Sequence, residues 1–235
     1  MFKVNRLYKK LGKREILNGI TTTFYDNGVS VIVGINGAGK TTFLDTIVGI
    51  LKKDGGSIEL NGFTPENKKF KEQVFYIPSD FYLPEYMTAK EYSKFILNHY
   101  PNSKYSIFLQ CAKWLEIDKY LNKTIETYSY GMKKKIQLAI MAASDVSLIL
   151  VDEVFNGLDF ETSILVQKML SELGKKKKVI IVSHEPSILK TFPTDIRLMK
   201  NGKIVEVSGT AEEIVEKIKK EGNLYSKLQK MEKYF

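Results

Sequence analysis

The sequence predicts an α/β protein with a mainly parallel sheet core, an antiparallel β part at the N-terminus and an inserted helical lobe. Short β-rich runs separated by turns fill residues 1–60. Two continuous β-branched runs follow at residues 147–151 and 179–182. Runs of that kind are typical of parallel strands that helices cover on both faces. Between these parts, residues 79–127 have helical rather than strand periodicity.

The N-terminal part contains four predicted strands. They lie at residues 2–8, 20–24, 29–34 and 57–60. Asp26-Asn27-Gly28 and Asn61-Gly62 supply turn residues between or after them.

The helical lobe begins after a strand-like segment at residues 74–77. Thr88 and Glu91 have the spacing of a capping box, whose side chains satisfy free N–H groups at the start of a helix. Apolar residues at helical spacing then surround Trp114 within residues 104–121. We expect a lobe over residues 79–127, inserted between core segments 1–78 and 128–209.

The C-terminal part combines a hairpin and a helix. Asn201-Gly202 predicts the turn between strands at residues 196–199 and 203–207. Thr210 and Glu213 repeat the capping-box spacing and predict a helical tail over residues 210–235.

Residues 34–41 have the G-x-x-x-x-G-K-T pattern of a phosphate-binding loop (P-loop), between a predicted strand and a helical segment. Its glycines allow successive N–H groups to point at phosphate oxygens, and the following helix N-terminus adds partial positive charge. Lys40 would reach the β and γ phosphates of a nucleotide, and the Thr41 hydroxyl would bind Mg²⁺. The predicted nucleotide-binding residues here are Gly34, Ile35, Asn36, Gly37, Ala38, Gly39, Lys40, Thr41 and Thr42.

Polar side chains end two later strands. Asp152 and Glu153 follow the apolar run 148–151, and His184 follows the run 179–182. Because ligands of open α/β sheets bind at the carboxyl ends of the strands, we expect all three near the P-loop. Asp152 would then hold the magnesium ion, Glu153 would polarise the attacking water, and His184 would hydrogen-bond the γ phosphate.

Composition narrows the classes of function. The formal net charge is +9, and lysine runs occur at residues 133–135 and 175–178. We expect the first run on the solvent side of a helix and the second in a solvated turn, without the interleaved aromatics of a nucleic-acid platform.

The single cysteine, Cys111, excludes an internal disulfide and favours a reducing compartment. No apolar run is long enough for a membrane span, and no signal-peptide core begins the sequence.

The most specific residues are Tyr128-Ser129-Tyr130-Gly131-Met132, which precede a helical run and the acidic strand end. The chain has, in this order, the P-loop, these five residues, Asp152-Glu153, Gly157-Leu158-Asp159 and His184. With this order it resembles the ATP-binding subunit of an ABC transporter over nearly its whole length. We call residues 128–132 the signature loop. The family usually has Leu-Ser-Gly-Gly-Gln there, so Ser129 and Gly131 match and the other three residues depart.

The resemblance implies an ABC-type P-loop ATPase that drives transport by ATP-dependent dimerisation. Ser129 and Gly131 of one subunit would contact the nucleotide of a second ATPase subunit, in a homodimer or a heterodimer. Separate transmembrane permease subunits would dock on the helical lobe, and no nucleic-acid partner is expected. The location implied is cytoplasmic, peripheral at the inner face of the cell membrane.

Some positions depart from the family. Ser79 stands near the place of a glutamine that usually touches magnesium, and Val154 replaces the usual proline. The aromatic residue that stacks on adenine aligns with Leu11, although Tyr8 is the alternative. A soluble, non-transporting ATPase of the same fold, such as a translation or assembly factor, is the alternative function.

Overall fold

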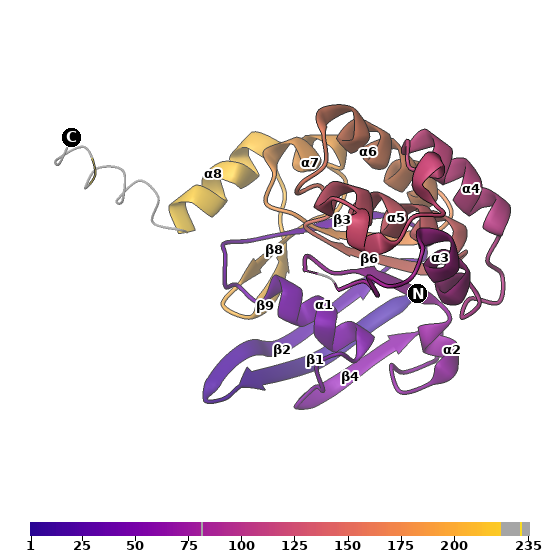
Figure 1. Ribbon diagram of the computed structural model, residues 1–235. Coiled ribbons are helices and arrows are strands. Elements are labelled where there is room, and N and C mark those ends of the chain that lie inside the picture. Colours follow the sequence, from indigo (N-terminus) through magenta and orange to yellow (C-terminus); the bar gives the residue numbers. More distant parts are fainter. Residues whose placement is uncertain (81, 222–230, 232–235) are drawn as a thin grey trace.

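The computed structural model describes residues 1–80, 82–221 and 231, and its described strands form two sheets (Figure 1). The first is antiparallel, in the order β2 (Arg14–Phe24), β1 (Phe2–Leu11) and β4 (Gly55–Leu60). The second has the order β5-β6-β7-β3-β8-β9, in which only β9 is antiparallel to its neighbour. Its strands are Val74–Ile77, Leu148–Asp152, Lys178–Val182, Gly28–Val33, Ile196–Lys200 and Lys203–Glu206. The predicted fold class is confirmed.

The large sheet is buried on both faces because successive side chains of a strand point to opposite sides. In β6, Ile149 belongs to one apolar core and Leu150 to the other. The first core lies under the helices α4 (Tyr105–Trp114), α5 (Tyr130–Ala143) and α6 (Phe160–Gly174). The second lies between the large sheet, α1 (Lys40–Val48) and the antiparallel sheet (Figure 1). This two-sided burial explains the continuous β-branched runs.

Residues 79–127 contain α3 (Ala89–Leu97), α4 and two short 3₁₀ turns, Asp118–Tyr120 and Ile125–Thr127. The capping box at the start of α3 is confirmed, because Thr88 and Glu91 each accept a hydrogen bond from the other's backbone N–H. The helix predicted over residues 104–121 is shorter than expected. It ends at Trp114, since Glu116 takes a left-handed backbone conformation with φ of 58°.

Three helices were not predicted: α2 (Lys68–Lys71), α6 and α7 (Pro186–Thr191). The capping box at Thr210 is present, with Glu213 as its partner, and α8 follows over Ala211–Glu221. The rest of the predicted tail, apart from residue 231, lies outside the described residues.

The expectation that both lysine runs face solvent is wrong for two residues. Lys134 is fully buried, and its ammonium group donates hydrogen bonds to two backbone carbonyls. Lys178 is a buried residue of β7 that pairs with Asp195 at 3.5 Å. Both ammonium groups are tolerated inside because each has hydrogen-bond acceptors there.

Candidate functional site

The candidate site lies where three neighbouring parallel strands end. The P-loop follows β3, Asp152 ends β6, and His184 follows β7 by two residues. Because β6, β7 and β3 are adjacent, their carboxyl ends open into one crevice of about 400 Å³. Its lining residues are Arg14, Ile16, Asn36, Gly37, Gly39, Lys40, Thr41, Thr42, Asp152, Glu153 and His184.

The backbone of the P-loop is folded tightly around the Lys40 side chain. The Lys40 ammonium donates to the carbonyls of Gly34 at 2.8 Å and Ile35 at 3.2 Å. Burial lowers the pKa of Lys40, and the carboxylates of Glu153 and Asp152 oppose that effect. Gly34 must be glycine because a Cβ there would collide with the Met199 carbonyl. The loop therefore buries a positive charge directly beneath its exposed edge.

Asp152 is a buried carboxylate that is only half satisfied. Its Oδ2 accepts a hydrogen bond from the Thr41 hydroxyl at 2.6 Å. Its Oδ1 is buried without a hydrogen-bond partner among the described residues. Burial raises the pKa of Asp152 to about 6, against the Thr41 hydrogen bond and with help from the Glu153 charge. A cation beside Oδ1 would offset this cost.

Glu153 and His184 are in direct contact, a pairing that the sequence did not indicate. Glu153 Oε1 lies 2.8 Å from His184 Nδ1, whereas Glu153 Oε2 is buried without a partner among the described residues. The Glu153 backbone has φ of 48°, and its N–H donates to the Val182 carbonyl at 2.9 Å. The carboxylate thus reaches the crevice from a tightly held turn between β6 and α6.

Ser129 and Gly131 do not line this crevice. Ser129 is the N-cap of α5, where its hydroxyl oxygen accepts a hydrogen bond from the Met132 N–H at 3.2 Å. Gly131 packs against the loop after β6, since a Cβ added to it would lie 3.0 Å from the Gly157 carbonyl. The structure therefore brings the P-loop, Asp152, Glu153 and His184 together in one crevice, whereas Ser129 and Gly131 lie outside its lining.

Two lining residues, Arg14 and Ile16, were not expected from the sequence. Both lie on β2, which begins at Arg14 instead of at residue 20. Leu11 and Tyr8, the two candidates for stacking on a base, are not among the lining residues. The Tyr8 ring instead lies close to Gly19 and Gly55 on the neighbouring strands. The alternation of polar and apolar residues along β2 could have indicated that Ile16 faces inward. That Ile16 lies beside the P-loop depends on how the two sheets pack, which the sequence does not show.

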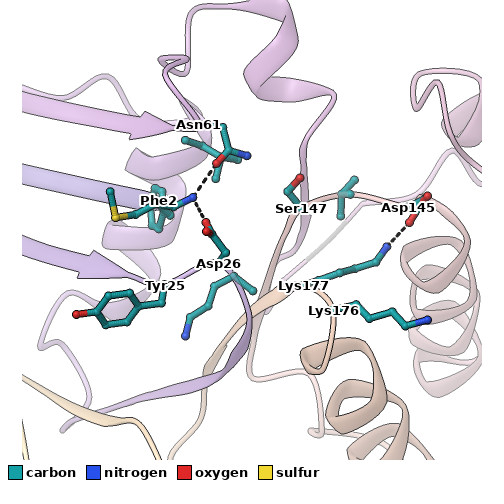
Figure 2. A pocket seen from close by; sticks show the side chains of 12 residues that line it. Phe2, Tyr25, Asp26, Asn61, Asp145, Ser147, Lys176 and Lys177 are labelled. Atoms are coloured by element: carbon teal, nitrogen blue, oxygen red, sulfur yellow. Dashed lines mark hydrogen bonds and ion pairs between the residues drawn. The ribbon is translucent and has the colours of Figure 1, made fainter.

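A second cavity, of about 430 Å³, lies at the opposite, amino end of the parallel strands (Figure 2). Ser147 and Lys178, at the starts of β6 and β7, contribute to its wall. Four of its charged groups already form two ion pairs: Lys177 contacts Asp145 at 2.7 Å, and the N-terminal ammonium contacts Asp26. The geometry therefore favours the P-loop crevice as the functional site.

The described residues contain no cluster of three or more His, Cys, Asp or Glu side chains that could bind a metal ion alone. A metal at Asp152 would need the Thr41 hydroxyl, water and ligand oxygens as further ligands, which is the usual situation for Mg²⁺. Within the described part of the chain, none of the helices combines the length and apolar character needed to cross a bilayer.

Comparison with known proteins gives one consistent family. The family model described as "ABC transporter" matches residues 17–156. A putative ABC transporter ATP-binding protein of Pyrococcus furiosus is 29% identical over 229 residues, which cover 94% of this chain and 85% of the relative.

Two solved structures show the same fold at 21% identity. An ATP-binding subunit of an ABC transporter superposes with a TM-score of 0.84 over 92% of each chain. A dimeric ATP-binding cassette in a post-hydrolysis state, bound to ADP and Pi, has a TM-score of 0.77 and covers 89% of this chain and 100% of that one.

Proposed function

The chain belongs to the ABC transporter family as an ATP-binding, ATP-hydrolysing subunit, and from this premise we propose that the P-loop crevice is its catalytic site. One observation carries the proposal: Lys40, Thr41, Asp152, Glu153 and His184 all line a single crevice at the carboxyl ends of β3, β6 and β7. The N–H groups of residues 34–42 would bind the phosphates, and the Lys40 ammonium would turn from its carbonyls towards the β and γ phosphates.

We further propose that magnesium accompanies the nucleotide. The residues fit this ion, because Asp152 has a buried Oδ1 without a partner and its other oxygen holds the Thr41 hydroxyl. Thr41 and Asp152 would hold the ion, directly or through water. Bound there, Mg²⁺ would neutralise charge on the transferring phosphate.

Glu153 is the proposed general base for the attacking water. Its Oε2 is the free acceptor of the carboxylate, whereas Oε1 is held by His184. Oε2 would accept the proton as the water oxygen bonds to the γ phosphorus and the bond to the β-γ bridging oxygen breaks. His184 would fix the carboxylate through Nδ1 and use Nε2 to hydrogen-bond the γ phosphate.

The proposed dimer explains why Ser129 and Gly131 stand outside their own crevice. In a head-to-tail pair, the N-terminus of α5 in one subunit would meet the γ phosphate bound by the other. The second subunit would be an identical or a related chain. Separate transmembrane permease subunits would dock on the helical lobe of residues 79–127. In this division of the chain, the lobe is inserted between core segments 1–78 and 128–209, and the tail of residues 210–235 follows the second core segment. The protein would then work at the cytoplasmic face of the membrane, without a nucleic-acid partner.

Glu153→Gln tests the assignment of the base. The variant keeps the size of the side chain but cannot accept the proton, so kcat should fall by about 10²- to 10⁴-fold while ATP affinity is retained. Unhydrolysed ATP should then hold two chains together, which size-exclusion chromatography with Mg²⁺ and ATP would detect. Turnover equal to that of the wild type would remove Glu153 from this role.

A further inference from the structure

Lys134 lies on α5, two residues after the signature-loop residue Met132, and its side chain is fully buried. Its ammonium group donates to the carbonyl oxygens of Glu153 at 2.9 Å and Asn156 at 2.8 Å. Burial lowers the pKa of Lys134, while the charges of Glu153 and Asp152 oppose that effect. Burying an ammonium group is costly unless it gains hydrogen bonds. The two hydrogen bonds that offset this cost both go to the segment that contains Glu153.

Both carbonyls belong to the turn of residues 153–157, which we call the Glu153 turn. Glu153 has φ of 48°, a left-handed backbone conformation that is strained for a non-glycine residue and persists only where its surroundings hold it. The Asn156 N–H donates to the Glu153 carbonyl at 3.2 Å and closes the turn. The Lys134 ammonium binds that same carbonyl and the Asn156 carbonyl, so it clamps the turn from the side of α5.

Tyr130 extends this network to a third segment. Lys134 Nζ lies 5.0 Å from the centre of the Tyr130 ring, within the range of a cation–π interaction. The Tyr130 hydroxyl donates to the Ser79 carbonyl at 2.9 Å. Tyr130 and Ser79 occupy two of the positions at which this chain departs from the family. The chain thus has a contact between the signature loop and the segment after β5 that the family's usual glycine could not make.

We propose that Lys134 is a positioning residue that holds the Glu153 turn in its hydrolytic conformation and fastens it to the signature loop. This inference rests on the proposed role of Glu153. It has a consequence for the dimer, because Ser129 would act on the partner's nucleotide and Glu153 on the chain's own. Lys134 would therefore link two parts of one subunit: the Glu153 turn, which acts on its own ATP, and the signature loop with Ser129, which acts on the partner's ATP.

Lys134→Met tests the proposal, because methionine fills a similar volume without charge or donors. We expect kcat to fall about ten- to a hundredfold, since small displacements of a catalytic group have effects of that size. The ATP dissociation constant of the single chain should stay within about twofold, because Lys134 is not among the residues that line the P-loop crevice. The melting temperature should change little, because the loss of a donor for two carbonyls is partly offset by the removal of a buried charge. Lys133→Met is the matched control, because Lys133 forms an ion pair at 2.7 Å with Glu85, a surface residue outside the crevice, and its loss should leave kcat unchanged.

The outcomes separate this inference from the proposed function. If the wild type hydrolyses ATP, Glu153→Gln does not, and Lys134→Met matches the wild type, the inference alone is overturned. A lower melting temperature together with weaker ATP binding in Lys134→Met would assign Lys134 a structural role and also overturn it. Should Lys134→Met fail to fold, Lys134→Gln takes its place: it is neutral and one bond shorter, so it cannot hold both carbonyls as lysine does. A wild-type kcat in that variant would overturn the inference. An inactive wild type would instead refute the proposed function.

Discussion

Asp152 and Glu153 are neighbours in sequence but have different surroundings. Asp152 is fully buried and receives the Thr41 hydroxyl, so its charged form is disfavoured until a cation arrives. The Glu153 side chain is 16% exposed and is held by His184 at the edge of the crevice. Two adjacent carboxylates are therefore suited to two tasks, metal binding and proton transfer.

Asp152→Asn should stabilise the protein without nucleotide while abolishing magnesium-dependent hydrolysis. The pKa of Asp152 is raised from 3.8 to about 6, so the native state resists ionisation of this group. Below pH 3.8, Asp152 is protonated in both the folded and the unfolded protein and costs no stability. As the pH rises from 3.8 to about 6, the unfolded protein ionises first and the folded protein loses stability, and above about 6 the loss is complete. The full difference corresponds to about 3 kcal/mol at most. Urea unfolding should therefore show a larger advantage of the variant at pH 8 than at pH 5.

Thr41→Val is a control for this prediction, because it removes the hydroxyl that binds Asp152 Oδ2 but leaves the carboxylate in place. Its stability relative to the wild type should fall where Asp152 is ionised, opposite in sign to the effect of Asp152→Asn. A stability difference between Asp152→Asn and the wild type that does not change with pH would show that Asp152 ionises normally in the folded protein.

For single residues, the sequence predicted a shared location, while their roles stay predictions. Lys40, Asp152, Glu153 and His184 line one crevice, as expected from their positions at or after the ends of recognisable strands. The burial of Lys134 could not be predicted, because a run of three lysines is ordinarily solvated. Only the left-handed turn at Glu153 brings two carbonyls to that ammonium group, and no sequence pattern indicates such a turn at a glutamate.

Elements were predictable where a single periodicity dominates. The strands of the large sheet have continuous apolar runs, so they were found with small errors at their ends. Helix α6 was missed although Thr162, Val166, Leu170 and Gly174 are buried at a spacing of four. Exposed apolar residues on its other faces obscure that pattern: Phe160, Ile164 and Leu165. Helices α2 and α7, with four and six residues, are too short to have a detectable period.

The hairpin of β1 and β2 contributes two side chains to the lining of the crevice, Arg14 and Ile16. Its register is irregular at three places, one of them next to Arg6 with φ of 50°. Tyr8 and Leu11, which follow irregularities of β1, are not among the lining residues of the crevice, whereas Arg14 and Ile16 of β2 are. Position along the strand alone could not predict this, because each bulge changes the direction of every later side chain.

ATP and GTP should bind within about tenfold of each other, which is about 1.4 kcal/mol. The residues that line the crevice include no Phe, Tyr or Trp, and the one ring among them, that of His184, is assigned to the γ phosphate. We therefore expect no stacking contribution of the roughly 1–3 kcal/mol known from nucleic-acid systems. Isothermal titration calorimetry should measure the ATP and GTP dissociation constants of the wild type and of Tyr8→Ala. These constants distinguish a site without base stacking from one in which Tyr8 stacks on the base. A strong preference for ATP that disappears in Tyr8→Ala would mean that Tyr8 moves onto the base when nucleotide binds.

In the proposed dimer, each chain would contact nucleotide through two separate surfaces. The crevice contains the P-loop and the hydrolytic residues, whereas Ser129 caps α5 outside it. The N-terminus of α5, 14 residues long, offers N–H groups and partial positive charge to an anion. A complete site then requires the crevice of one chain and the signature loop of another.

Mixing two inactive variants tests this arrangement in a homodimer. Lys40→Met should lose nucleotide binding in its own crevice but keep an intact signature loop. Ser129→Arg should bind ATP as a single chain, but the bulky cation should block its signature loop. A mixed dimer combines the crevice of the Ser129→Arg chain with the signature loop of the Lys40→Met chain, so one of its two sites is complete. We expect the mixture to hydrolyse ATP although each variant alone does not.

The pattern of recovery distinguishes action across the dimer from action within one chain. Random pairing makes half of the dimers mixed, and each mixed dimer has one complete site, so the mixture should reach at most about a quarter of the wild-type rate. A double variant, with Lys40→Met and Ser129→Arg in the same chain, is the control, because mixing it with either single variant completes no site. If the mixture of single variants is as inactive as the separate proteins while wild-type homodimers form, Ser129 acts within its own chain or both sites must be intact for turnover. ATP binding by Ser129→Arg alone separates these explanations, since a residue acting within its own site would weaken it.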